Sequence, residues 1–156
     1  MFSVDLATVN ERILELAHAQ SAGIRQHLEQ AGVEIVHGRG TLTSEATVEV
    51  TNDDPSWEIT ADTILLATGA RPRVLADAVP DGERILSWEQ IYQLDELPEH
   101  LIVVGSGVTG AEFASAFHAL GSTVTLVSSR DRVLPGEDVD AAGVLEDVFT
   151  RRGMNV

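Results

Sequence analysis

Apolar positions recur at helical spacing over the first part of the chain. Successive members of this set are separated by three, four or seven residues, which places them on one face of a helix. They are Leu6, Val9, Ile13, Ala17, Ile24 and Leu28. Gly32 follows at the position where a helix commonly ends in glycine. The pattern predicts one long helix over about 6–31, packed on one side and solvated on the other.

Short strands are predicted next, because apolar and polar residues alternate in parts of residues 33–67. The alternating apolar residues are Val33, Ile35, Val48 and Val50. Turn-forming segments at Gly38-Arg39-Gly40 and at 52–56 separate these strands. Residues 63–67 are Thr63 followed by four apolar residues in succession, which is typical of a strand covered on both faces.

A connector rich in proline is predicted over about 70–100. It contains one short helix at 88–94, for which Ser87 is the N-cap candidate. Gln90, three residues further on, supplies the other half of a capping box.

From residue 101 the pattern is strand, helix, strand. Apolar runs at 101–104 and 123–127 flank a helical segment at 108–120. A last helix is predicted over 139–152, with Asp138 as its cap. Its predicted apolar face consists of Val144, Leu145, Val148 and Phe149. Residues 154–156 are predicted to begin another strand.

Composition narrows the class of protein. The 156 residues correspond to roughly one domain. Twenty-five acidic residues against ten Lys and Arg give a net charge of −15, so we expect no nucleic-acid partner. No apolar run exceeds four residues, whereas a membrane span needs about 20, and no targeting segment is evident. We therefore expect a cytoplasmic protein without a membrane span.

The side chains that bind metals or form disulfides are poorly represented. The chain has no cysteine, which excludes a disulfide scaffold or a thiolate metal site within it. The five histidines show no paired ligand spacing, so no metal site is expected.

The strongest chemical signal is Gly105-Ser106-Gly107-Val108-Thr109-Gly110, which follows an apolar strand and opens a helix. In this context Gly105 permits a tight turn, Gly107 lets a pyrophosphate approach the backbone, and Gly110 lets helix and strand pack closely. The pyrophosphate would lie on the free N–H groups of the helix N-terminus. A tight turn without a ligand is the alternative, and the strand-turn-helix-strand context favours dinucleotide binding.

The end of the second strand bears on nucleotide choice. An acidic residue there would bind the ribose 2′-hydroxyl of NAD, but the chain has Ser128-Ser129-Arg130 instead. Two hydroxyls and a guanidinium suit the 2′-phosphate of NADP. Asp131 could neutralise Arg130 as an ordinary surface pair, so NADP is favoured and NAD remains the alternative. Glu112, in the first helical turn, is by itself a solvated carboxylate that suits the helix dipole.

Ala67-Thr68-Gly69 ends the apolar run at 63–67, and ligands of open α/β sheets bind at such strand ends. An ordinary strand end explains these residues equally well, and a hairpin turn explains Gly38-Arg39-Gly40.

In their order along the chain, these segments resemble the middle of a flavoprotein of the pyridine nucleotide–disulfide oxidoreductase family. The segments that carry the resemblance are Gly38-Arg39-Gly40, Ala67-Thr68-Gly69-Ala70-Arg71-Pro72, Ser87 to Leu101, Val103 to Glu112, and Asp131-Arg132-Val133-Leu134-Pro135. Within the family, the sequence most resembles the lipoamide-dehydrogenase-like NAD(P)H:quinone reductases.

The resemblance implies an α/β fold made of parts of two Rossmann-like domains that bind FAD and NAD(P), with a small antiparallel β meander. Residues 1–75 would be a partial FAD-binding domain, 76–100 a connector, and 101–156 the N-terminal part of the NAD(P)-binding domain. The implied FAD contacts are Gly40, Ala67, Thr68 and Gly69. The implied NAD(P) contacts are Gly105, Ser106, Gly107, Val108, Thr109, Gly110, Glu112 near the nicotinamide, and Ser128, Ser129 and Arg130 at the adenine ribose.

The implied reaction is hydride transfer from NAD(P)H to the flavin, and on to a small-molecule quinone or disulfide acceptor. Dihydrolipoamide dehydrogenase and soluble transhydrogenase are alternatives, and a non-catalytic nucleotide-binding module is an alternative of another class. The family's FAD fingerprint, redox cysteine pair and dimer domain are absent from the chain. We therefore expect an internal part of a longer, homodimeric enzyme, with no catalytic residue of its own and no activity in isolation.

Overall fold

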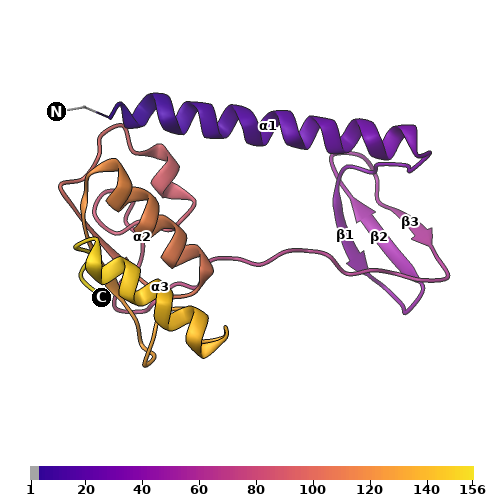
Figure 1. Ribbon diagram of the computed structural model, residues 1–156. Helices are drawn as coiled ribbons and strands as arrows, with labels where there is room; N and C mark the ends of the chain where they lie inside the picture. Colours follow the sequence, from indigo (N-terminus) through magenta and orange to yellow (C-terminus); the bar gives the residue numbers. More distant parts are fainter. Residues whose placement is uncertain (1–3) are drawn as a thin grey trace. The chain divides into compact units, whose positions relative to one another are not determined.

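The structure is a computed structural model that describes residues 4–156. These residues form two compact units. One unit combines the chain up to Leu14 with Val74–Val156, and the other is Glu15–Arg73. Figure 1 follows the chain through both. None of the helices in the described part of the chain is long and apolar enough to cross a membrane.

Helix α1, Leu6–Gln30, confirms the long helix predicted from periodicity. Its end is also as expected, since the Val33 N–H donates to the Leu28 carbonyl across Gly32. The predicted packed face is wrong over most of its length, because only Leu6 and Asn10 of this helix are buried and Ile24 is exposed. Periodicity identifies an apolar face, but burial also needs a partner surface.

The unit Glu15–Arg73 contains a three-stranded antiparallel sheet in the order β1-β2-β3. Its strands are Arg39–Leu42, Thr47–Thr51 and Trp57–Thr60. Val48 pairs with Ile59 and Val50 with Gly40, which confirms the strand predicted around Val48 and Val50 and the turn at 52–56. The expected small β meander is therefore present.

Three local predictions in this unit are wrong. Val33 and Ile35 lie in no strand, and Arg39 and Gly40 belong to β1 rather than to a turn. Residues 63–67 form no strand, and Leu65 and Leu66 are 87% and 66% exposed. An apolar run becomes a buried strand only where neighbouring strands satisfy its backbone groups. No described strand pairs with this segment.

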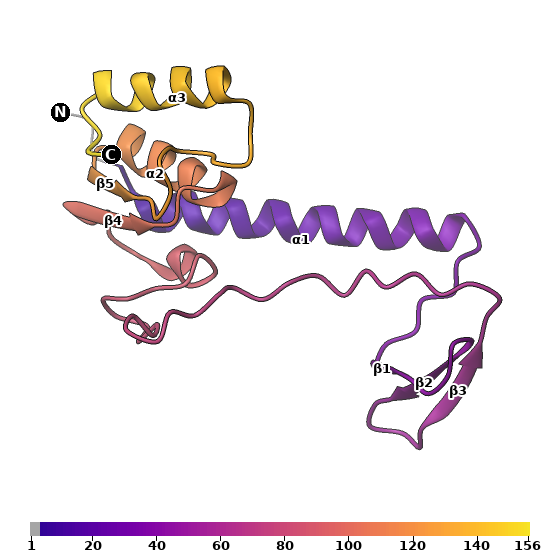
Figure 2. The ribbon, with the colours of Figure 1, turned by 90° about the horizontal axis from the view of Figure 1, so that it is seen from below.

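The other unit contains the predicted strand-helix-strand arrangement. Strands β4, His100–Val104, and β5, Thr123–Val127, are parallel and are connected by α2, Val108–Leu120. Figure 2 shows β4 and β5 side by side. Asn155 extends this sheet on the far edge of β5, because its N–H donates to the Val124 carbonyl and its carbonyl accepts from Leu126. Of the strand predicted to begin at 154–156, the structure shows this single parallel bridge at Asn155 and no longer element.

The predicted capping bonds of the two remaining helices are present, but the N-cap residue of the first is Glu89 rather than Ser87. Ser87 and Gln90 form reciprocal hydrogen bonds at the start of the short helix η1, Gln90–Gln93, which is shorter than the predicted 88–94. The Asp138 carboxylate accepts from the Asp140 and Ala141 N–H groups at the start of α3, Val139–Arg151.

One residue of the predicted apolar face of α3 is wrong. Val144 is 62% exposed. Ala142, which is not among the residues predicted for this face, is 1% exposed. Phe149 is buried as expected, and Leu145 packs against the core from a partly buried position. The helix therefore presents a slightly rotated face to the sheet.

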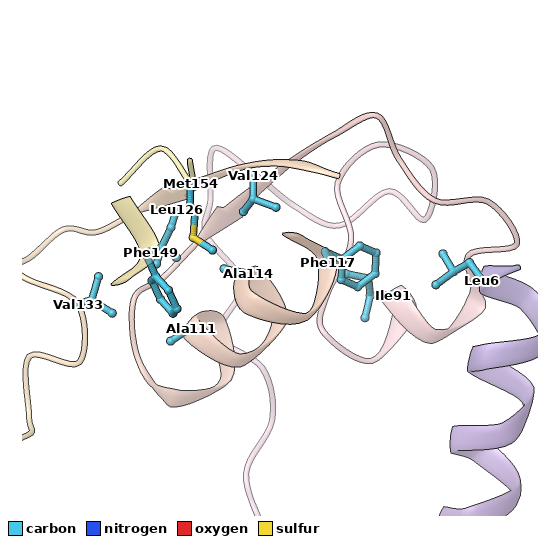
Figure 3. Packing of buried hydrophobic residues seen from close by; sticks show 10 residues of the cluster. All are labelled: Leu6, Ile91, Ala111, Ala114, Phe117, Val124, Leu126, Val133, Phe149 and Met154. Carbon is cyan, nitrogen blue, oxygen red and sulfur yellow. The ribbon is translucent and has the colours of Figure 1, made fainter. Parts of the chain in front are cut away.

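The core of this unit lies between the parallel sheet and its helices (Figure 3). Its buried members are Leu6, Ile91, Ala111, Ala114, Phe117, Val124, Leu126, Val133, Phe149 and Met154. Beside them the buried Asn10 side chain donates from Nδ2 to the Leu94 carbonyl at 2.8 Å. This bond fastens the first turns of α1 to the segment after η1.

Asn10→Ala should lower the free energy of unfolding by about 1–2 kcal/mol, because it leaves the Leu94 carbonyl without its partner in a partly buried position. Urea unfolding measures the change. Gln20→Ala, which removes an exposed amide from the same helix, is the control and should stay within about 0.5 kcal/mol. Equal changes in the two variants would contradict a fastening role for Asn10.

Candidate functional site

The glycine-rich turn lies between the end of β4 and the start of α2. Gly105 has φ +122°, a conformation that favours glycine, and its N–H donates to the Val127 carbonyl at 2.9 Å. Gly107 is the N-cap of α2, with no side chain to bond the helix amides. The first intrahelical bond runs from Ala111 N–H to the Gly107 carbonyl, so the amides of Val108, Thr109 and Gly110 precede it.

Helix α2 begins unusually close to the turn. A Cβ at Gly110 would lie in direct overlap with the carbonyl oxygen of Gly105. By contrast, a Cβ at Gly107 would meet nothing within 4 Å. The backbone is therefore packed tightly on one side and open on the other, where exposed Val108 and Thr109 begin the helix. Open amides and the positive end of the helix dipole suit a diphosphate.

Ser106 occupies the turn but its side chain is 5% exposed and is directed into the protein. Its hydroxyl donates to Ser128 Oγ at 2.7 Å, and its carbonyl accepts from the Leu134 N–H at 2.8 Å. Ser128 Oγ in turn accepts from the Arg130 N–H at 3.0 Å. We call this Ser106–Ser128–Leu134 set the serine clip. It ties the glycine-rich turn to the loop that follows β5.

A cavity of about 200 Å³ opens at the carboxyl end of β5. Its lining residues are Leu126, Ser128, Arg130, Asp131, Arg132, Glu146 and Val156. Two arginines and two acidic residues thus line one space. The buried Nε of Arg132 has no hydrogen-bond partner in the described part of the chain, while its Nη2 donates to the Pro135 carbonyl at 3.3 Å.

The structure brings together only some of the residues expected to contact NAD(P). The serine clip joins the turn to Ser128, and Arg130 lines the cavity from an exposed position. Ser129 and Glu112 are exposed, Glu112 in the first turns of α2. Their contacts with a nucleotide stay predictions.

Sequence reasoning missed two charged lining residues, Arg132 and Glu146, and the apolar lining residues Leu126 and Val156. Arg132 lies in the segment 131–135 that carried the family resemblance, so a signal for it existed. Glu146 is one acidic residue in the middle of α3, and nothing in the sequence distinguishes it from its neighbours. Only the folded position of the helix shows its place at the cavity.

The residues expected to contact FAD lie in the unit Glu15–Arg73. Gly40 is in β1, where a Cβ would lie 3.1 Å from Val48 Cγ1, so sheet packing alone favours glycine there. Ala67, Thr68 and Gly69 are exposed on a segment without helix or strand. The chain contains one Gly-x-Gly-x-x-Gly, in the other unit, so these residues do not by themselves build a site for the FAD diphosphate.

Residues 4–156 contain no group of three or more His, Asp or Glu side chains placed to hold a metal ion. The candidate functional site is thus the glycine-rich turn with the neighbouring cavity.

A parallel strand, a glycine-rich turn and a helix whose start leaves amides open define a dinucleotide-binding α/β protein of the Rossmann type. The chain belongs to the pyridine nucleotide-disulphide oxidoreductase family, whose profile matches residues 4–156. This confirms the resemblance found in the sequence.

Individual relatives are similar over nearly the whole chain. It is 51% identical to an NAD(P)H dehydrogenase (quinone) of Mycobacterium tuberculosis, over 98% of this chain and 32% of that protein. It is 37% identical to a dihydrolipoyl dehydrogenase of Chlorobaculum tepidum, over 99% of this chain and 33% of that protein. The crystal structure of LpdA from Mycobacterium tuberculosis matches with a TM-score of 0.87 and 49% identity, over 99% of this chain and 35% of that one. The chain thus spans about a third of the length of these relatives.

Gly110→Ala should destabilise the turn by about 1–3 kcal/mol, because the added methyl group overlaps the Gly105 carbonyl oxygen. Urea unfolding measures the loss. Gly143→Ala is the matched control, since that glycine lies within α3 and a Cβ there meets nothing within 4 Å. The control should be neutral or stabilising by up to about 1 kcal/mol. Similar losses in both variants would refute the special closeness at Gly110.

Proposed function

We propose that the chain binds NAD(P)H at the glycine-rich turn, with the pyrophosphate on the amides at the start of α2. The observation that carries this proposal is the contrast between Gly110, where no Cβ fits, and Gly107, where nothing lies near. Close packing on one side holds the amides in place, and open space on the other admits the ligand. In this arrangement Gly105, Ser106, Gly107, Val108, Thr109 and Gly110 form the pyrophosphate site.

The other site residues follow from the same placement. Glu112 would lie near the nicotinamide, and the loop after β5 would meet the adenine ribose. Because the Ser128 hydroxyl is engaged in the serine clip, Ser129 and Arg130 remain to contact the ribose substituent directly. Gly40 and Ala67-Thr68-Gly69 would contact FAD from their exposed backbone, together with a diphosphate site that this chain does not contain.

The activity we propose is NAD(P)H-dependent oxidation-reduction with FAD as the second cofactor. FAD supplies a ring that accepts a hydride from the nicotinamide and passes electrons to an acceptor. Support for a quinone acceptor comes from the 51% identity to a protein named NAD(P)H dehydrogenase (quinone). A disulfide acceptor is supported less strongly, by the 37% identity to a dihydrolipoyl dehydrogenase. The homodimer and the cytoplasmic location expected from the sequence stay predictions.

For the nucleotide we propose a preference for NADPH over NADH. The end of β5 lacks the acidic residue that would bind a ribose 2′-hydroxyl, and Arg130 lines the cavity beside it. A guanidinium forms strong charge-assisted bonds with a phosphate but gains little from a hydroxyl.

Arg130→Glu should weaken NADPH binding by about tenfold or more while changing NADH binding by less than about threefold, because only NADPH loses a charge-assisted contact. Calorimetric titration of each nucleotide measures both constants. Arg73→Glu reverses the same charge at an exposed position of the other unit and is the control. Equal losses of NADH and NADPH in the Arg130 variant would remove the basis for the proposed preference.

The 156-residue chain should not retain FAD through purification, because its one glycine fingerprint lies in the unit proposed for NAD(P)H. The absorption spectrum of the purified chain tests this directly. A stoichiometric flavin band would show that the exposed segment at Ala67-Thr68-Gly69 holds FAD without a diphosphate turn.

A further inference from the structure

Glu146 has a fixed position in the cavity at the end of β5. It is half-buried on α3, and its Oε2 accepts from the Val133 N–H at 3.0 Å. Val133 is fully buried in the core, so this bond fastens the middle of the loop to the helix. The carboxylate is therefore held toward the loop after β5, and Glu146 is one of the residues that line the cavity.

The charges around the cavity balance. Arg130 and Arg132 contribute two positive groups, while Asp131 and Glu146 contribute two negative ones. Of the two carboxylates, Asp131 is exposed, where solvent and salt screen it. Glu146 is half-buried and anchored, so its field acts on an occupant of the cavity with less screening.

We propose that Glu146 is a specificity-determining residue that limits the preference for NADPH. This inference rests on the proposed placement of the adenine ribose at the loop after β5. A ribose 2′-phosphate carries between one and two negative charges, as other phosphate monoesters do, and the Glu146 carboxylate repels it. The neutral 2′-hydroxyl of NADH meets no such repulsion. Glu146 therefore opposes Arg130 and brings the affinities for the two nucleotides closer together.

Glu146→Gln tests the charge separately from the anchor. The amide oxygen of Gln still accepts the Val133 N–H, while the negative charge is removed. Binding of NADPH and NADH to the full chain is measured by calorimetric titration at low salt. We expect NADPH to bind about five- to tenfold more tightly and NADH to change by less than about twofold. The gain should shrink as salt is raised.

Asp147→Asn is the matched control, because it removes the same charge from the next residue of α3 at an exposed position outside the cavity lining. It should change neither nucleotide by more than about twofold. Glu146→Ala removes both the charge and the hydrogen bond from Val133. Urea unfolding of all three variants measures how much the loss of that bond lowers the free energy of unfolding. The Ala variant should lose about 1 kcal/mol, and the Gln variant less.

The outcomes separate this inference from the function on which it rests. If the unmodified chain binds both nucleotides and Glu146→Gln leaves their affinity ratio unchanged, Glu146 is only an anchor and the inference is overturned. The inference is also overturned if Asp147→Asn changes the ratio of NADPH to NADH affinity as much as Glu146→Gln does. The effect would then come from the net charge of the chain and not from the position of Glu146. If the unmodified chain binds neither nucleotide, the proposed function fails and takes this inference with it.

Discussion

The close approach of α2 to the end of β4 is the constraint on which the candidate site depends. At Gly110 the helix backbone reaches the Gly105 carbonyl at a distance that excludes any side chain. This contact sets where the helix begins, and so places its first amides beside the carboxyl end of the parallel strands. Because Gly107 has no side chain to cap them, these amides remain open to a ligand. One pattern of glycines thus accounts both for the close packing and for the open amides.

The loop after β5 is held from two directions. The serine clip ties it to the glycine-rich turn, and Glu146 ties it to α3. The glycine-rich turn and the loop after β5, which are distant in sequence and together form the proposed dinucleotide site, are therefore connected by short hydrogen bonds. Buried Ser106 makes both of the serine-clip bonds that join the turn to this loop.

Sequence reasoning succeeded where local chemistry decides the structure. The bounds of α2 and β5, the capping box at Ser87 and the cap at Asp138 depend on residues close in the chain, and they were predicted correctly. Prediction failed where the burial of an element depends on a second surface that packs against it. The run at 63–67 and the apolar stripe of α1 have the composition of buried elements, yet both are largely exposed in the structure. Glu146 was missed for a related reason, since its place at the cavity depends on the packing of α3 against a distant loop.

The exposed segment at Leu65 and Leu66 has a consequence for handling the protein. It combines apolar side chains with backbone groups that no described strand pairs. Such a stretch is a template for cross-strand pairing between molecules, and proteins normally protect it with charge, proline or a covering element. Here Asp62 precedes it and Pro72 follows it, but the leucines themselves carry no such protection. The 156-residue chain by itself therefore presents an apolar segment that favours association between molecules.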